Sequence, residues 1–235
     1  MRVLRRLALL PVVVLALVVA CAALSIDELV QDLVFRYVVS HEVRLLANGF
    51  TVLGTVSAGT GLLGALAVAG YWTADLALWR VSLGGLAGVA IGGLATQAVK
   101  HVACRARPRV YDGWGVGPRV LPHDAAHGFV HWPCVSKVNY QGFPSGHATT
   151  AFAVAAALTA LAPALWPAWL ATAAGIGASR ILLNAHFLSD VLGGGLLGWW
   201  AGKLGLWVVA RFTPHVPTRP PPAAAAEAPP SVAQP

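Results

Sequence analysis

Charged residues are scarce in this sequence. Only 11% of the 235 residues are Asp, Glu, Lys or Arg, against roughly 25% in a typical soluble protein. The hydrophobic content of 57% and the mean hydropathy of +0.68 are correspondingly high. This excludes an ordinary soluble globular domain and indicates an integral membrane protein. The net charge of +7 could indicate nucleic acid as a partner. The sequence, however, contains no soluble module with a stripe of basic residues and interleaved aromatics, so nucleic acid is excluded.

Long apolar runs take the place of the missing charges. A membrane-spanning helix needs about 20 mostly apolar residues. The sequence therefore predicts an all-α polytopic membrane protein, a bundle of six transmembrane helices. The predicted spans are Leu7–Leu24, Thr51–Trp72, Val81–Val99, two helices within Ala148–Ser179 separated by the proline turn 163–167, and Val191–Ala210.

The spans divide the chain into three parts. Residues 1–25 form the first transmembrane helix or a signal anchor, with a cleaved signal peptide ending at a lipid-modified Cys21 as the alternative. Residues 26–212 form the core, with an interfacial helix over Ile26–Phe50 and five further spans. Residues 213–235 are rich in Pro and Ala and are predicted to be disordered.

Arg2, Arg5 and Arg6 place the N-terminus in the cytoplasm by the positive-inside rule. Alternation then puts the 101–144 loop and the 180–190 junction outside, so a site built there faces the periplasm or exterior of the inner (plasma) membrane. The outer loop nevertheless gathers basic residues, which indicates an anionic substrate: Lys100, Arg105, Arg107, Arg109, Arg119 and Lys137.

Two further patterns leave alternatives open. Cys104 and Cys134 flank the basic loop and form either a disulfide or two free thiols. Glycines recur every fourth residue in two predicted spans, which favours close helix packing without a catalytic part. They are Gly84, Gly88 and Gly92, and Gly194, Gly198 and Gly202.

Three polar clusters stand at the outer ends of spans. The first follows span three, the second precedes span four, and the third joins spans five and six. They contain Lys100, Arg107 and Pro108; Pro144, Ser145, Gly146 and His147; and Ser179, Arg180, His186 and Asp190. Alternation brings all three to the same side of the membrane.

This set of side chains predicts a phosphate-binding site. Arg107 and Arg180 offer forked donors to phosphate oxygens, and Lys100 adds a point charge. Ser145 and Gly146 stand at a helix start, where free backbone N–H groups and the helix dipole favour an anion.

The remaining residues predict nucleophilic catalysis. His186 and Asp190 are four residues apart, so a helical or near-helical path puts them on one side. A carboxylate that accepts from one ring nitrogen leaves the other free to attack. His147 is then available as the general acid, through a phosphohistidine intermediate that water hydrolyses.

At these residues the sequence resembles the type 2 phosphatidic acid phosphatase family. Its signature is Lys, six residues, Arg-Pro; then Pro-Ser-Gly-His; then Ser-Arg, five residues, His, three residues, Asp. The resemblance covers roughly residues 50–210. It implies six membrane helices and a metal-independent phosphatase that needs no cofactor. Catalysis would fall to His186, His147 and Asp190, with the phosphate held by Lys100, Arg107, Ser145, Gly146 and Arg180.

We therefore expect a phosphoric monoester or diphosphate hydrolase that acts on a lipid phosphate, with membrane lipids around it and no obligate protein partner. Candidate substrates are undecaprenyl pyrophosphate, phosphatidylglycerol phosphate, phosphatidic acid and the phosphates of lipid A. A lipid phosphotransferase, a vanadate-dependent haloperoxidase and a non-catalytic lipid-phosphate binding protein are the alternatives. A metal site at His123, His127, His131 and Cys134 is disfavoured, because Gly128 and Pro133 oppose one rigid helix across the set.

Overall fold

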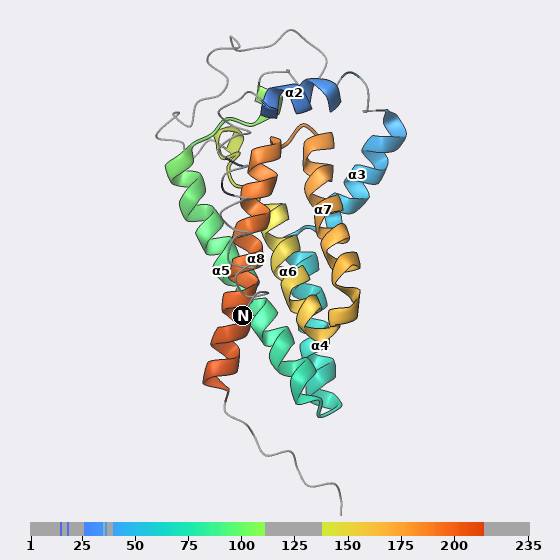
Figure 1. Cartoon of the computed structure of the whole chain (residues 1–235), viewed down its shortest axis with the longest axis vertical. Helices are drawn as coiled ribbons and strands as arrows, with labels where there is room; N and C mark the ends of the chain where they lie inside the picture. The colour runs from blue at the N-terminus through green and yellow to red at the C-terminus, as the bar shows by residue number, and fades with distance from the viewer. Residues whose placement is uncertain are drawn as a thin grey trace, which may run out of the picture.

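The computed structural model describes residues 15, 18, 26–34, 36, 40–110 and 138–213. Within these residues every regular element is helical and no strand occurs, as predicted (Figure 1). The α-helices are α2 (Ile26–Leu33), α3 (His41–Leu53), α4 (Val56–Trp72), α5 (Leu76–Ala103), α6 (Gly146–Leu161), α7 (Trp166–Leu182) and α8 (Leu188–Phe212). Short 3-10 turns lie at Pro108–Val110, Val138–Tyr140 and Pro163–Leu165.

Helix α5 is the one described helix that is by itself long and apolar enough to cross a membrane. The pair α3 and α4 also passes this test when counted together, although the two helices are bent by 50°. Large apolar side chains on the outer faces of the helices are strongly exposed, for example Trp72 at 79% and Leu94 at 75%. Of the predicted first span, only Leu15 and Val18 lie within the described residues.

The segment before α4 differs from the sequence prediction of one interfacial helix over Ile26–Phe50. The structure has two separate helices there. α3 begins after Ser40, whose Oγ accepts a hydrogen bond from the Val43 N–H at 3.3 Å, and it runs past Phe50 to Leu53. α4 then starts anew at Thr55, whose Oγ1 accepts from the Ala58 N–H at 3.2 Å. The two N-terminal caps, rather than the end of the apolar pattern, set these boundaries.

Glycines let the three central helices pack closely. A Cβ on Gly88 of α5 would lie 2.6 Å from the Cα of Gly202 on α8. A Cβ on Gly198 of α8 would collide with the backbone of Thr149 on α6. The packing interpretation of the two glycine rows is therefore confirmed, because backbone approaches backbone where a side chain would stand.

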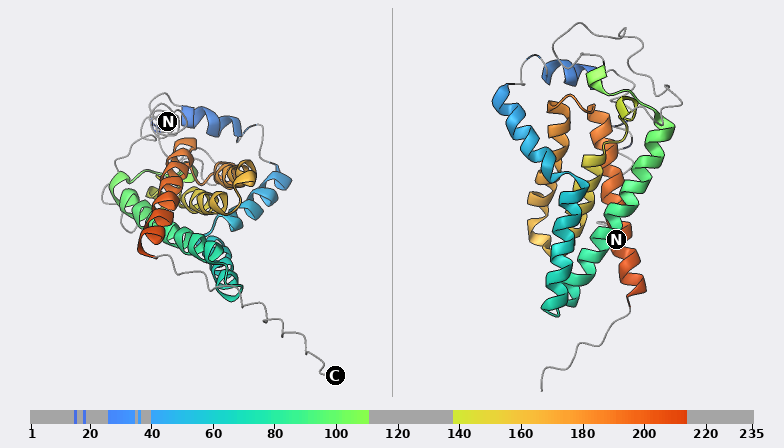
Figure 2. Two further views of the ribbon diagram at one scale, coloured as in Figure 1. Left: turned by 60° about the horizontal axis from the view of Figure 1, so that its bottom comes forward. Right: turned by 180° about the vertical axis from the view of Figure 1, so that it is seen from behind.

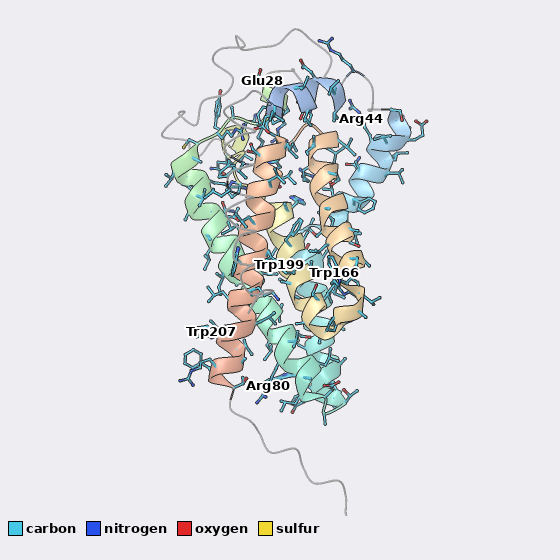
Figure 3. All side chains as sticks on the ribbon, viewed as in Figure 1. Glu28, Arg44, Arg80, Trp166, Trp199 and Trp207 are labelled. Carbon is cyan, nitrogen blue, oxygen red and sulfur yellow. The ribbon has the colours of Figure 1, made fainter. Side chains whose placement is uncertain are left out.

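The proline turn between α6 and α7 is also confirmed. Pro163–Leu165 forms a 3-10 turn, and α7 runs back antiparallel to α6. As a result the end of α5, the start of α6, the end of α7 and the start of α8 all lie toward one end of the bundle, which α2 crosses (Figures 1 and 2). Glu28 and Arg44 lie at this end, and Arg80 and Trp207 lie toward the opposite one (Figure 3).

Candidate active site

The three polar clusters of the sequence meet at the end of the bundle that α2 crosses. Lys100 lies in the last turn of α5, Arg180 in the last turn of α7, and Asp190 in the first turn of α8. Lys100 interacts electrostatically with Arg107, Arg180 and Asp190, although these residues come from separate segments. The end positions of four helices thus bring together side chains that are up to 90 residues apart in sequence.

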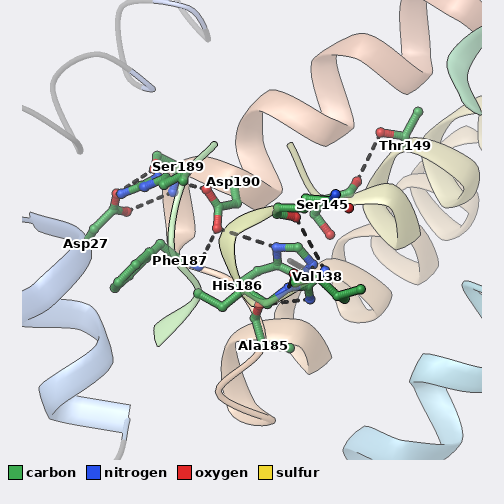
Figure 4. A network of polar contacts seen from close by, with 12 residues as sticks. Asp27, Val138, Ser145, Thr149, Ala185, His186, Phe187, Ser189 and Asp190 are labelled. Atoms are coloured by element: carbon green, nitrogen blue, oxygen red, sulfur yellow. Dashed lines mark hydrogen bonds and ion pairs between the residues drawn. The ribbon is translucent and has the colours of Figure 1, made fainter. Parts of the chain in front are cut away.

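His186 lies in the connection between α7 and α8 and is only 2% exposed. Its Nδ1 is 3.4 Å from Asp190 Oδ2, and its Nε2 is 3.2 Å from Arg107 Nη1 (Figure 4). Burial lowers the pKa of His186 to about 4 despite the opposing influence of Asp190. The imidazole is therefore neutral at physiological pH and carries a lone pair on one ring nitrogen.

Asp190 is completely buried and is held from three sides. Its Oδ2 accepts a hydrogen bond from the Phe187 N–H at 2.9 Å, and its Oδ1 accepts from Arg105 Nη1 at 2.8 Å. The contact with His186 Nδ1 is longer and does not have full hydrogen-bond geometry. His186 precedes α8, so the pair meets because Asp190 folds back to cap the helix, and not because both lie on one helical face.

Backbone carbonyls fix the guanidinium of Arg107. Arg107 Nε donates to the Val138 carbonyl at 3.1 Å, and Nη1 donates to the Ala185 carbonyl at 3.3 Å. Burial, followed by repulsion from Arg109 and Arg180, lowers the pKa of Arg107 to about 10. The group therefore remains a cation at neutral pH and lies directly beside the imidazole.

The start of α6 offers further donors. Ser145 is fully buried, and its Oγ has no hydrogen-bond partner among the described residues. A Cβ on Gly146 would lie 3.8 Å from Lys100 Nζ, so the first turn of α6 lies next to that ammonium group. An unpartnered hydroxyl, a helix N-terminus and a cation at one place match the donors that a phosphate group requires.

Arg180 and His147 contact the region of the bend between α3 and α4. Arg180 Nη1 donates to Thr51 Oγ1 at 3.0 Å. A Cβ on Gly54 would lie 3.3 Å from the Cβ of His147, so the bend also closes against that histidine. His147 interacts electrostatically with Arg180, Lys100 and Arg107, which places it among the cations of the site.

The structure adds residues that the sequence prediction did not assign to the site. Asp27, Arg105 and Ser189 form a buried polar cluster with Asp190, and Thr51 contacts Arg180. One signal for Asp27 was present in the sequence. It is three and seven residues before Val30 and Val34, so a helix puts it on the same inward face.

No group of three potential metal ligands occurs within the described part of the chain. The histidine and cysteine positions 123, 127, 131 and 134 lie outside it. Cys104 is disulfide-bonded, and its partner also lies outside the described residues, as do both Cys21 and Cys134.

A family model described as the PAP2 superfamily matches residues 82–214, which include all three polar clusters. Two curated relatives, both named lipid A 1-phosphatase, are from Rhizobium etli and Rhizobium johnstonii. Each is 32% identical over 123 residues, which is 52% of this chain and 48% and 46% of the relatives. The chain thus spans about half the length of the curated relatives it matches.

Two solved structures have a similar fold. The PAP2-type phosphatidylglycerolphosphate phosphatase of Bacillus subtilis superposes with a TM-score of 0.61 at 22% identity, over 87% of this chain and 98% of that one. LpxE of Aquifex aeolicus superposes with a TM-score of 0.54 at 19% identity, over 78% and 94%.

Proposed function

The chain belongs to the PAP2 superfamily, and we propose that it is a membrane phosphatase that hydrolyses the phosphate group of a lipid. The observation that carries the proposal is the site at the end of the bundle. There a neutral, buried His186 lies between Asp190 and a cluster of cations. Neutral imidazole next to convergent phosphate donors is the arrangement that nucleophilic attack on phosphorus requires.

The first step is transfer of the phosphoryl group to His186. With the Nδ1 proton directed at Asp190, the lone pair lies on Nε2, which attacks the phosphorus as the bond to the lipid oxygen breaks. Burial, followed by repulsion from Arg180, Lys100 and Arg107, lowers the pKa of His147 to about 4 in the free site. His147 therefore takes up a proton when the anionic phosphate binds beside it, and donates that proton to the departing oxygen. Arg107 now contacts Nε2, so its N–H groups must turn to the phosphate oxygens when substrate binds.

The second step is hydrolysis of the phosphohistidine. His147, which lost its proton in the first step, accepts one from water as the water oxygen attacks phosphorus. The P–N bond then breaks, and the electron pair returns to His186 Nε2. Lys100, Arg107 and Arg180 stabilise the charge on the phosphoryl oxygens in both steps, and this electrostatic contribution supplies most of the acceleration.

Lipid A carrying a 1-phosphate is the first substrate to test, because both curated relatives are named for that activity. Phosphatidylglycerol phosphate follows, because it is the substrate named for the Bacillus subtilis structure. Undecaprenyl pyrophosphate and phosphatidic acid complete the set. Release of free phosphate identifies a hydrolase, whereas transfer to an added lipid acceptor identifies a phosphotransferase.

The chain is a membrane protein, and the proposed orientation places the site on the periplasmic or outer side of the plasma membrane. Three observations support this orientation. The N-terminal arginines favour the cytoplasm for the first residues. The basic site residues lie together at one end of the bundle, so the proposed phosphate binding accounts for cations on the side that the positive-inside rule disfavours. Cys104 is disulfide-bonded, which suits an oxidising compartment. The count of six spans is part of this proposal.

The test is the His186→Ala variant, assayed for phosphate release from each lipid in detergent. We expect at least a 10³-fold loss of kcat, because no other group replaces the nucleophile. His41→Ala is the matched control, since His41 is exposed at the start of α3. Turnover by His186→Ala equal to that of the control would contradict the mechanism. The same assay with a chelator tests metal independence, because activity should be unchanged.

A further inference from the structure

Arg105 is buried between two carboxylates from distant parts of the chain. It is 1% exposed and lies in the connection after α5. Its Nη2 donates to Asp27 Oδ2 on α2 at 2.7 Å, and its Nη1 donates to Asp190 Oδ1 on α8 at 2.8 Å. The guanidinium also lies over the ring of Phe187, 4.7 Å from its centroid. Figure 4 shows Asp27, Ser189 and Asp190 at one side of His186.

Ser189 closes this cluster. Its backbone N–H donates to Asp27 Oδ1 at 2.8 Å, and its hydroxyl donates to Asp27 Oδ2 at 2.5 Å. Arg105 Nη1 also donates to the Ser189 hydroxyl oxygen at 2.5 Å. Asp27 therefore accepts hydrogen bonds from the first turn of α8 as well as from Arg105, and both of its oxygens are used.

The charges of the cluster depend on one another. Burial of a guanidinium opposes its charge, but Asp190 and Asp27 together outweigh burial and hold the pKa of Arg105 above its usual value. With Asp27 present, Arg105 is shared by two carboxylates instead of pairing with Asp190 alone. A buried charge that loses one of its partners is strongly destabilised, so each member constrains the position of the others.

We propose that Asp27 and Arg105 are positioning residues for catalysis. Through them α2 holds Asp190 with Oδ1 engaged by Arg105 and Oδ2 directed at the His186 ring. The inference rests on the proposed function, since it assigns a task to residues that act through the nucleophile. Neither residue touches the phosphate. Their contribution is to fix the ring orientation and tautomer of His186 through Asp190.

The geometry distinguishes this role from simple attachment of α2. Gln31, also on α2, donates to Asn184 Oδ1 at 2.7 Å, and Val30 and Val34 pack against the apolar cluster of Ala148, Ile181 and Val191. These contacts hold the helix on the bundle without touching Asp190. Removal of the Gln31 contact should therefore loosen α2, whereas removal of the Asp27 charge should disturb the catalytic carboxylate.

The experiment compares Asp27→Asn, Arg105→Lys, Gln31→Ala and Glu42→Gln in the full chain, with kcat, KM and thermal unfolding measured on the same lipid substrate in detergent. We expect Asp27→Asn to lower kcat about tenfold with KM within about twofold, a typical size for a residue that orients a catalytic ligand. Arg105→Lys keeps the charge but loses the fork, so we expect an equal or larger loss of kcat.

Glu42→Gln removes one exposed carboxylate of α3 and should behave like the unmodified chain. Gln31→Ala should lower the unfolding temperature and leave kcat within about twofold. If Asp27→Asn retains full kcat, or if it loses kcat only as much as Gln31→Ala does at a comparable loss of stability, the positioning role is wrong.

His186→Ala separates the two proposals. Its inactivity beside a fully active Asp27→Asn overturns the positioning role alone, whereas its full activity overturns the proposed function itself.

Discussion

The end of the bundle that α2 crosses and the middle of the bundle are held together by different kinds of contact. At the end that α2 crosses, buried ionic groups from three segments form a chain of contacts that ends at His186: Asp27, Arg105 and Asp190. In the middle of the bundle, α5, α6 and α8 meet through glycines such as Gly88 and Gly198, where backbone approaches backbone. We expect the first region to keep its shape when it loses a phosphate-binding cation such as Arg180, whereas the glycines of the second have no room for even one added carbon atom. Under the proposed function the catalytic end determines the rate, whereas the glycine contacts determine whether the helices can pack.

The largest effect is expected in the glycine region. Gly198→Leu introduces a side chain that collides with the backbone of Thr149, and neither helix can move away without separating from α5. We expect no folded protein, measured as loss of the monodisperse peak in size-exclusion chromatography in detergent. Gly61→Leu is the matched control, because a Cβ there meets nothing within 4 Å. Normal folding of Gly198→Leu would show that the close contact is not required.

The next effect belongs to the catalytic end. Arg180→Ala should lower kcat/KM by about 10²–10³-fold, the usual result of removing one preorganised donor from a charged transition state. Arg180 Nε is buried without a hydrogen-bond partner in the described residues, so the group has donor capacity left for a phosphate oxygen. The unfolding temperature should change little, in contrast with Gly198→Leu. A loss of folding in Arg180→Ala would erase the distinction between the two regions.

A smaller effect concerns pH. Because burial lowers the pKa of His186 to about 4, its neutral form predominates above this pH and its protonated form below. Protonation removes the lone pair on Nε2, so kcat/KM should fall about tenfold for each pH unit below about 4. Between pH 5 and 8 the ionisation of His186 should leave kcat/KM unchanged. A fall in kcat/KM centred near pH 6.5 that persists in His147→Gln would contradict a buried, neutral nucleophile.

The sequence predicted those features that depend on local pattern. Pro163 and Pro167 predicted the turn between α6 and α7, and the glycine rows predicted the close packing of α5 against α8. The three polar clusters could be recognised by the spacing of their residues. Because successive spans cross the membrane in alternate directions, the sequence also predicted that the clusters lie on one side. In each case the relevant residues are neighbours in sequence or recur with a helical period.

Other features depend on contacts that no local pattern encodes. The break at Gly54 has no proline, and the pattern of the sequence predicted the boundary between Phe50 and Thr51, several residues too early. α5 runs from Leu76 to Ala103, beyond the predicted Val81–Val99, so Arg80 lies within the helix and donates to the Thr213 carbonyl, 133 residues away, at 3.0 Å. Asp27 and Arg105 are 78 residues apart, so only the folded chain shows that they pair.

The contacts of Asp27 also bear on how the protein is made. Asp27 accepts a hydrogen bond from the backbone N–H of Ser189, a residue that is synthesised 162 residues later. α2 therefore cannot take its final place until the start of α8 has been delivered to the membrane, and Arg105 likewise waits for Asp190. Every nascent chain that stops short of α8 also lacks Asp190, the carboxylate beside His186. Under the proposed function the catalytic set is therefore complete only once the start of α8 has been made, and α8, the last helix of the described residues, secures α2.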